Sequence, residues 1–424
     1  MNARSGGAAA GTTPGPRAWP ARARALLARV RALRPMVVDG NRMQLLVNGD
    51  DYFPALLAAI ENAHRSVHLE TYILADDKIG ARVMEALTAA AARGVEVRLL
   101  VDGFGGGAYA RRLRDELAGL GVELRIFRPE RWWRLERKLL RRLHRKMAVI
   151  DDRVAFVGGI NIIDDWTEVP IRTTGRAGPR FDFAVRCEGP IVAAVSLAVR
   201  RLWWTVTLTQ SGARGLPPTP VALVPQPAFD DGVPASLLLR DNLRNRHAIE
   251  RAYLDAIEQA RHDILIANAY FLPGRRFRAA LRAAVARGVR VRLLLQGRVE
   301  YPIQHHAQQA MYGDLLGAGL EIHEYQASYL HAKVAVVDER WATVGSSNID
   351  PYSLLLAREA NVVVDDARFA TRLRTALELA IEQDSVALRA ADYARRSIFT
   401  RALDWCAYLL VRAATVVLAR APHY

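Results

Sequence analysis

The sequence predicts an α/β protein made of two duplicated halves. Short β-branched segments alternate with segments of helical Ala/Leu periodicity, a pattern that indicates a sheet covered by helices on both faces. Residues 58–74 match residues 255–272 with one residue gained, and residues 91–103 match residues 285–297. A His-x-Lys motif also occurs once in each half, so we expect the repeat to extend over the whole folded chain.

Each half follows the same order: helix, buried strand, helix, buried strand, and then the strand that carries His and Lys. In the first half we expect the two buried strands at residues 67–73 and 95–101, where β-branched residues concentrate. The halves are predicted at residues 36–214 and 235–395. The Pro-rich stretch 215–234 between them predicts a linker.

The two ends of the chain differ in composition. Residues 1–35 are rich in Ala, Arg, Gly and Pro and predict a disordered basic arm. Residues 396–424 are apolar but interrupted by Arg412, which predicts a membrane-interface segment, with a helix docked on the second half as the alternative. The absence of 18 uninterrupted apolar residues argues against a spanning helix.

The charge balance predicts an acidic partner. The 424 residues include 59 Lys and Arg against 44 Asp and Glu, a net charge of +15. Nucleic acid, anionic lipid and a phosphorylated substrate all satisfy this balance. Cys187 and Cys406 each lie among apolar residues, far apart in the chain, and are predicted to be buried free thiols.

The most specific signal is a doubled motif built around two of the chain's rare lysines. LHRKMAVID (143–151) and LHAKVAVVD (330–338) both read His-x-Lys-x-x-x-x-Asp, and the turns GGIN (158–161) and GSSN (345–348) follow them. Arg supplies nearly every other positive charge, so Lys146 and Lys333 are predicted to need a compact ammonium group.

These residue types are suited to attack on a phosphodiester. His and Lys two positions apart in a strand point to the same face, so each motif can aim both groups at one phosphate. Lysine and asparagine side chains would hold the phosphate oxygens, one histidine would attack, and the other would protonate the leaving oxygen. Such a site needs no metal and no cofactor. A lone motif would be an ordinary surface pair in most proteins, but repetition of every element argues against that interpretation.

The doubled HKD motif resembles that of the phospholipase D superfamily. Its flanks are more specific and resemble the bacterial cardiolipin synthase B branch: RRLHRKMAVIDDRVAFVGGIN and LHAKVAVVDERWATVGSSNIDPYSLLLAREANVVV. The resemblance extends over residues 41–384. The resemblance implies two phospholipase D-like α/β domains forming a pseudo-dimer with one composite active site. It further implies a phosphatidyltransferase that joins two phosphatidylglycerol molecules into cardiolipin and releases glycerol through a phosphohistidine intermediate.

The resemblance also implies the site residues. It assigns catalysis to His144, Lys146, Asp151, His331, Lys333 and Asp338, and phosphate binding to Asn161, Asn348 and Ser346. A downstream carboxylate is expected to orient each histidine: Asp182 in the first half and Glu359 in the second. Gly159 stands where the pattern has Ser, so a hydroxyl contact to phosphate is expected from the second half only.

Residues 131–146 predict a basic amphipathic helix with Trp132, Leu135, Leu139 and Leu143 on one face. This pattern is typical of an element at an anionic membrane surface, and a core-packed helix with a solvated basic face is the alternative. The resemblance implies a peripheral protein at the cytoplasmic face of the bacterial inner membrane, with phosphatidylglycerol as its anionic lipid substrate.

Three other functions are alternatives to phosphatidyl transfer. A phospholipase D-type hydrolase would use water as the acceptor, and the choice between water and an alcohol depends on how closed the pocket is. A nuclease of the same superfamily would suit the charge, but no aromatic residues interleave with basic ones as base-stacking platforms. A non-catalytic lipid-binding scaffold conflicts with two intact motifs. The oligomeric state and the identity of the nucleophilic histidine stay open.

Overall fold

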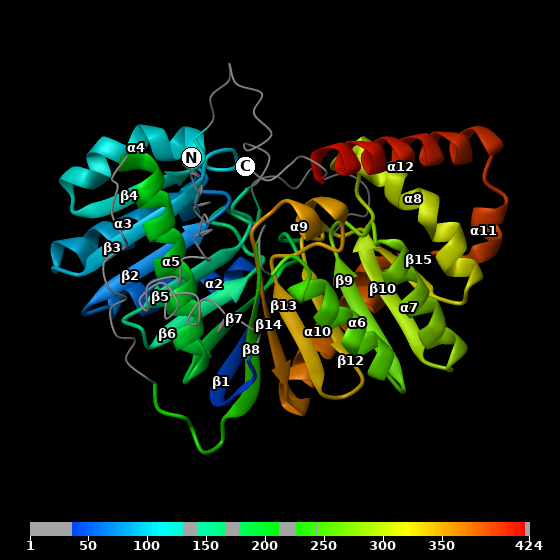
Figure 1. Ribbon diagram of the computed structural model, residues 1–424, viewed down its shortest axis with the longest axis horizontal. Helices are drawn as coiled ribbons and strands as arrows, with labels where there is room; N and C mark the ends of the chain where they lie inside the picture. The colour runs from blue at the N-terminus through cyan, green and yellow to red at the C-terminus, as the bar shows by residue number, and fades with distance from the viewer. Residues whose placement is uncertain (1–35, 130–141, 167–177, 212–225, 242–244, 420–424) are drawn as a thin grey trace, which may run out of the picture. The chain divides into compact units, whose positions relative to one another are not determined.

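The computed structural model describes residues 36–129, 142–166, 178–211, 226–241 and 245–419 (Figure 1). The predicted basic arm, most of the predicted amphipathic helix and most of the predicted linker lie outside these residues. Leu143, expected on that helix, instead forms an isolated β-bridge with Arg358 and is buried.

All fifteen strands of the described chain belong to one sheet, in the order β15-β11-β10-β9-β12-β13-β14-β8-β1-β7-β6-β5-β2-β3-β4. The strands of the first half are β1 (Val38–Val47), β2 (Ser66–Thr71), β3 (Glu96–Asp102), β4 (Val122–Phe127), β5 (Lys146–Ile150), β6 (Val154–Gly158) and β7 (Phe183–Glu188). Those of the second half are β8 (Val233–Arg240), β9 (Asp263–Asn268), β10 (Arg290–Gln296), β11 (Glu321–Tyr325), β12 (Lys333–Val337), β13 (Trp341–Gly345), β14 (Glu359–Asp365) and β15 (Ser385–Ala387).

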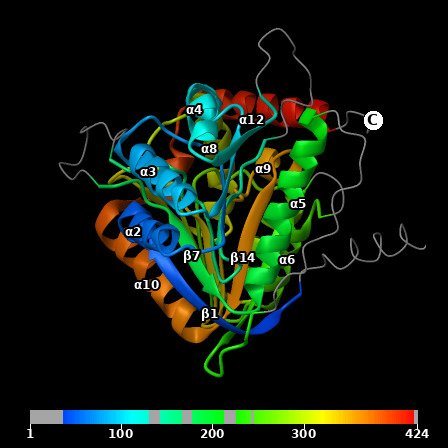
Figure 2. The same cartoon turned by 90° about the vertical axis from the view of Figure 1, so that its left-hand side faces the viewer.

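Helices cover both faces of this sheet (Figure 2): α5 and α10 pack against the same face, whereas α2 and α6 pack on the opposite face, each on its own half. The longer helices of the first half are α2 (Asn48–Glu61), α3 (Lys78–Ala92), α4 (Gly107–Gly119) and α5 (Ile191–Ser211). The second half contributes α6 (Ala248–Gln259), α7 (Arg275–Ala286), α8 (Pro302–Gly317), α9 (Pro351–Leu355), α10 (Ala367–Asp384), α11 (Ala390–Ala394) and α12 (Ile398–Ala419).

The strand order confirms the predicted duplication. From the outside inward, the first half runs β4-β3-β2-β5-β6-β7-β1 and the second, inside its edge strand β15, runs β11-β10-β9-β12-β13-β14-β8, so each strand except β15 has an equivalent among the described strands. The predicted buried strands at 67–73 and 95–101 appear as β2 and β3 within two residues. The halves meet where β1 and β8 pair antiparallel, at Val38 with Ala235 and at Asn41 with Val233.

One hydrophobic core spans both halves. It contains Ile191, Val195 and Val199 of α5 together with Phe369, Leu373 and Leu377 of α10, and buried residues of the central strands from each half. Each of the two helices also contacts the first strand of the opposite half, α5 touching β8 and α10 touching β1. A shared apolar core of this kind opposes relative motion of the halves, so they behave as one body.

Among the described helices, one is long and apolar enough to cross a bilayer by length and composition, namely Ile191–Gln210 of α5, with a mean hydropathy of 1.4. Half of that stretch is buried inside the protein. The Arg200 guanidinium lies 2.6 Å from Asp152, in the turn after β5. This helix therefore also satisfies the requirements of a core helix of the α/β sheet.

The C-terminal helix α12 docks on α8. Tyr408 packs with Met311 and Ala307, and the buried Asp404 carboxylate forms ion pairs with His306 at 2.8 Å and Arg396 at 2.9 Å. The opposite face of α12 is apolar and exposed, and Cys406 lies on it. The prediction of a buried thiol is thus confirmed for Cys187 and wrong for Cys406.

Candidate active site

Two short bridges between the halves bring the motifs together. Leu143 pairs with Arg358, and Phe181 pairs with Leu330, both in parallel orientation. The His144 amide donates to the Arg358 carbonyl at 3.0 Å, and the His331 amide donates to the Phe181 carbonyl at 2.8 Å. Each bridge joins the segment before one histidine to the segment before the other half's carboxylate.

The bridges exchange the orienting carboxylates between the halves. Nδ1 of His144 lies 3.0 Å from Oε1 of Glu359, and Nδ1 of His331 lies 2.6 Å from Oδ2 of Asp182. The expected pairing within each half, His144 with Asp182 and His331 with Glu359, was therefore wrong, although the four residues were the right ones. The reason is that the β-bridges run between the halves. Glu359 directly follows Arg358, which pairs with the segment before His144, and Asp182 directly follows Phe181, which pairs with the segment before His331.

Each lysine is buried and tied to the backbone of its own motif. Lys146 Nζ donates to the carbonyl of His144 at 2.6 Å, and Lys333 Nζ donates to the carbonyl of His331. Burial lowers the pKa of Lys146 to about 7, with Lys333 adding to the effect, and burial lowers the pKa of Lys333 to about 8. Two ammonium groups in one dry pocket create a demand for an anion.

Burial favours the neutral form of both imidazoles. It lowers the pKa of His144, against the opposing effect of Glu359, and it lowers the pKa of His331 well below the usual value, with Lys333 and Arg180 adding to the effect. A neutral imidazole that donates its Nδ1 proton to a carboxylate keeps a lone pair on Nε2. Each histidine is thus arranged to attack or to accept a proton at Nε2.

Asparagines from both turns join the site. Asn161 Oδ1 accepts from the amide of Ile73 at 3.1 Å, which leaves its amide NH₂ to contact a ligand. Asn348 is almost fully buried, and within the described part of the chain its Oδ1 has no hydrogen-bond partner. A buried acceptor without a partner is costly, and only a donor, such as a hydroxyl group of a ligand, would complete it.

Ser346 supports the carboxylate rather than the pocket. Its hydroxyl donates to Glu359 Oε2 at 2.5 Å and accepts from the amide of Ala360 at 3.0 Å. The predicted phosphate contact from this hydroxyl was therefore wrong, because its single proton is donated to Glu359 and its oxygen accepts from the backbone. In the first half a side chain at Gly159 would clash with the Asp182 carboxylate, which explains the missing Ser.

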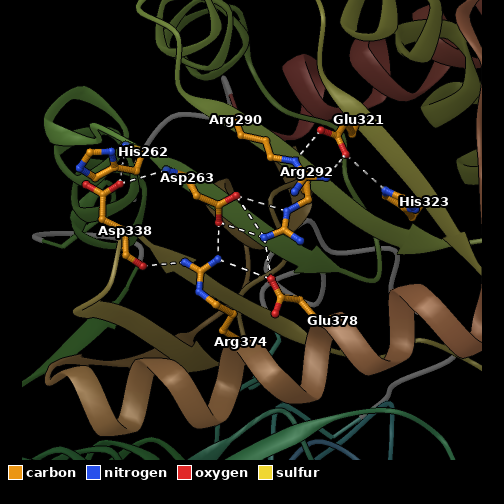
Figure 3. Close-up of polar contacts among 9 residues, drawn as sticks. All are labelled: His262, Asp263, Arg290, Arg292, Glu321, His323, Asp338, Arg374 and Glu378. Carbon is orange, nitrogen blue, oxygen red and sulfur yellow. Dashed lines mark hydrogen bonds and ion pairs between the residues drawn. The ribbon is translucent and has the colours of Figure 1, made fainter.

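The two motif aspartates lie at the far ends of the motif strands. Asp151 accepts from the amides of His64, Arg65 and Ser66 at 2.9, 2.7 and 2.8 Å. Asp338 accepts from the equivalent amides and, with His262, Asp263 and Arg374, forms the polar network of Figure 3.

The catalytic assignment of Asp151 and Asp338 was wrong for a geometric reason. The five residues of β5 span about 16 Å, which separates Asp151 from His144. Both aspartates adopt left-handed backbone conformations, with φ of 55° and 49°, where Asp is tolerated in a turn. Their function is to fix the turn that begins β2 or β9.

Asp151→Ala should lower the free energy of unfolding by about 2–4 kcal/mol, because three backbone amides lose a charged acceptor. Asp151→Asn keeps one acceptor and suits the positive φ, so it should cost clearly less. Urea unfolding measures both. If the folded Ala variant has lost activity at temperatures where it stays folded, the structural role is contradicted.

Sequence reasoning missed a pair of residues that position the histidine segments. Asp102 Oδ2 accepts from the amide of Leu143 at 2.8 Å, and its equivalent in the repeat, Gln296, accepts from the amide of Leu330 at 3.1 Å through Oε1. The matched segments 91–103 and 285–297 contain both residues, so the repeat carried the signal. Burial raises the pKa of the fully enclosed Asp102 to about 6.

Asp102→Asn should fold, because Gln296 performs the same contact with an amide oxygen. The raised pKa of Asp102 means that its contribution to wild-type stability falls as pH rises from about 4 through 6. The Asn variant lacks this titration, so its stability relative to wild type should increase by on the order of 1–3 kcal/mol between pH 4 and pH 8. Urea midpoints at several pH values test this. Parallel pH curves for the two proteins would contradict it, and Asp102→Leu should be destabilised at every pH.

Tyr72 is a second residue that sequence reasoning missed. Its ring centroid lies 5.0 Å from that of His144, and Lys146 Nζ lies 5.5 Å from the same ring. The equivalent tyrosine, Tyr270, instead donates to Glu300 and packs on Tyr301. The surroundings of the two motifs are therefore similar but not identical.

Within the residues that the structure describes, no cluster of three or more His, Cys, Asp or Glu side chains is placed to hold a metal ion.

A continuous α/β sheet from two equivalent halves, with a buried His-Lys pair from each half, defines the class of protein. The family model described as "Cardiolipin synthase, PLD-like domain" matches residues 56–168 and 253–380. The chain belongs to this cardiolipin synthase family of the phospholipase D superfamily. It is accordingly a phosphatidyltransferase that acts on phospholipid.

Sequence relatives agree with this placement. The chain is 39% identical over 356 residues to cardiolipin synthase B of Escherichia coli K12, which covers 82% of each chain. It is 32% identical over 366 residues to cardiolipin synthase A of Pseudomonas fluorescens, covering 84% of this chain and 73% of that protein.

Solved structures support the fold. The phosphatidylserine synthase of Haemophilus influenzae superposes with a TM-score of 0.67 at 11% identity, covering 93% of this chain and 98% of that one. The polyphosphate kinase of Porphyromonas gingivalis gives a TM-score of 0.54 at 14% identity, over 89% of this chain and 53% of that one.

Proposed function

We propose that this protein synthesises cardiolipin from two molecules of phosphatidylglycerol and releases glycerol. The observation that carries the proposal is the pair of buried histidines, each held through Nδ1 by a carboxylate of the other half and accompanied by a buried lysine. Family membership supplies the phospholipid class, and two buried ammonium groups suit an anionic diester.

In the first step, Nε2 of His144 attacks the phosphorus of one phosphatidylglycerol. The bond from phosphorus to the glycerol headgroup oxygen breaks, and His331 gives that oxygen its proton, so glycerol leaves. Lys146 and Lys333 neutralise the non-bridging oxygens, with Asn161 and Asn348 donating to them. The bound anion raises the pKa of His331, which supplies the protonated form that this step requires.

In the second step, a headgroup hydroxyl of another phosphatidylglycerol attacks the phosphohistidine. His331, now neutral, accepts the hydroxyl proton, the phosphorus–nitrogen bond breaks, and His144 is restored. Glu359 stabilises the charge that develops on His144 through the bond to Nδ1. The order of the roles follows the resemblance to the family, and the site of the adduct decides it.

The reaction is tested by incubating the purified protein with phosphatidylglycerol vesicles in the presence of a chelator, followed by mass analysis of lipids and water-soluble products. We expect cardiolipin and glycerol in equal amounts. Phosphatidic acid with glycerol would identify a hydrolase that uses water. Loss of turnover with chelator, restored by divalent ions, would contradict the mechanism.

Either His144→Ala or His331→Ala should lower turnover by at least about 10³-fold, because attack and protonation act as a unit. A phosphatidylglycerol labelled in its phosphate should leave an acid-labile adduct on His144, retained in His331→Ala and absent from His144→Ala. Peptide mapping locates it, and the exposed His247→Ala serves as the control. An adduct on His331 would reverse the two roles.

Lys146→Arg and Lys333→Arg should each lower kcat/KM by about 100-fold although the charge is kept. Both ammonium groups are enclosed, and a larger planar guanidinium would displace the phosphate from the line of attack. Lys78→Arg is the matched control, since Lys78 is exposed and forms a surface ion pair with Asp164. Turnover near that of wild type in either site variant would contradict the need for a compact ammonium.

We further propose that the protein works as a peripheral protein at the cytoplasmic face of the bacterial inner membrane, where phosphatidylglycerol is presented. The support is the net charge of +15, which favours an anionic surface.

A further inference from the structure

Large exposed apolar side chains gather in two equivalent loops. The loop after β3 presents Phe104, which is 62% exposed. The loop after β10 presents Val299 and Tyr301, and the first turn of α8 that follows it presents Ile303, each more than half exposed. Because β3 and β10 are equivalent strands of the repeat, the two loops lie at equivalent places in the two halves.

Both loops adjoin the histidine segments. Asp102, two residues before Phe104, accepts from the amide of Leu143, the neighbour of His144. Gln296, three residues before Val299, accepts from the amide of Leu330, the neighbour of His331. Each exposed apolar group therefore follows, within a few residues, the side chain that holds a histidine segment in place.

Helix α12 adds a third apolar element on the same side. It lies along α8, which begins directly after the second loop, and it contacts α9, which follows Asn348 and its turn (Figure 1). The face away from α8 carries exposed apolar side chains at helical spacing, and Phe399 is the most exposed of them at 84%. These side chains are Ile398, Phe399, Leu403, Trp405, Leu409 and Leu410.

The charge on α12 is positive where it meets solvent. Asp404 is buried and paired with His306 and Arg396, whereas Arg401 is exposed. An exposed apolar helical face bordered by arginine, with its acidic residue hidden, is suited to the boundary between lipid headgroups and acyl chains of an anionic bilayer.

We propose that Phe104, Val299, Tyr301, Ile303 and the outward face of α12 form one docking surface that seats the protein on an anionic phospholipid bilayer with its histidine segments toward the lipid. This inference rests on the proposed function, because a phospholipid whose phosphate enters the site keeps its acyl chains in the bilayer. The side of the protein through which the phosphate enters must then face lipid. A second protein copy on the same surface would keep the substrate away from that side.

The test compares two triple variants with wild type. Phe399→Ser/Leu403→Ser/Leu410→Ser alters the docking surface without touching the catalytic residues. Leu120→Ser/Leu379→Ser/Val386→Ser removes three similarly exposed apolar side chains that lie elsewhere and is the matched control. Both sets of positions are solvent-exposed, so both variants should fold, which circular dichroism verifies.

Co-sedimentation with vesicles of equal parts phosphatidylcholine and phosphatidylglycerol, at high salt, measures docking. The docking variant should lose about tenfold in bound fraction and in activity on vesicles, because salt screens the arginines and only apolar burial remains. Its activity on short-chain phosphatidylglycerol below the micellar concentration should stay within about twofold of wild type, and the control variant should resemble wild type throughout. A further variant, Tyr301→Ser/Ile303→Ser, should weaken binding in the same direction.

Unchanged vesicle binding in the docking variant, or an equal loss in the control, overturns the proposal. So does a wild-type dimer in light scattering that the docking variant converts to a monomer, since the occupant would then be a second copy. Vesicle binding without cardiolipin formation on either substrate would leave the docking surface standing and reject the proposed reaction.

Discussion

The exchange of carboxylates between the halves is the interaction on which the rest of the site depends. Glu359 is fully buried beside His144, and Asp182 is nearly so beside His331. Removing one partner of such a pair leaves an uncompensated polar or charged group in a dry interior, which is strongly destabilising. Neither half contains a complete site, so the two halves must fold against each other before any chemistry is possible.

The shared core and the exchanged carboxylates reinforce one another. The apolar cluster that joins α5 and α10 across the halves includes Phe181 and Leu330 and holds their bridge in register, while Leu143 of the other bridge packs against α5 in a separate cluster. A slip of one residue in either bridge would turn the histidine to the opposite side. The geometry of a few polar atoms thus depends on burial of many apolar side chains some distance away.

The electrostatics of the pocket are those of a site prepared for an anion. Burial and mutual repulsion lower the pKa of Lys146, and burial lowers that of Lys333, while burial raises the pKa of Asp182 to about 6. A bound phosphodiester would offset both the desolvation of the two ammonium groups and the repulsion between them. The repeat is also broken where the reaction needs asymmetry, with Asp102 facing one histidine segment and Gln296 the other, and with Gly159 in place of a serine.

Much of this protein could be predicted from the order of its residues. Hydrophobic periodicity and the internal match predicted the α/β class, the duplication and the positions of β2 and β3. The repeated motif identified His144, Lys146, His331 and Lys333, although β5 and β12 begin at the lysines and each histidine stands just before its strand rather than in it as expected. Membership of the cardiolipin synthase family follows from the same residues.

Only the tertiary structure decided which residues meet. The pairing of His144 with Glu359 crosses 215 positions of sequence, and no local propensity encodes such a contact. The same limit explains the two wrong assignments: Asp151 and Asp338 belong to the motif in sequence but lie a strand's length from the histidines, and Ser346 turns its hydroxyl to Glu359. Spacing along a strand determines the direction of a side chain, whereas long-range packing of the two halves determines its partner.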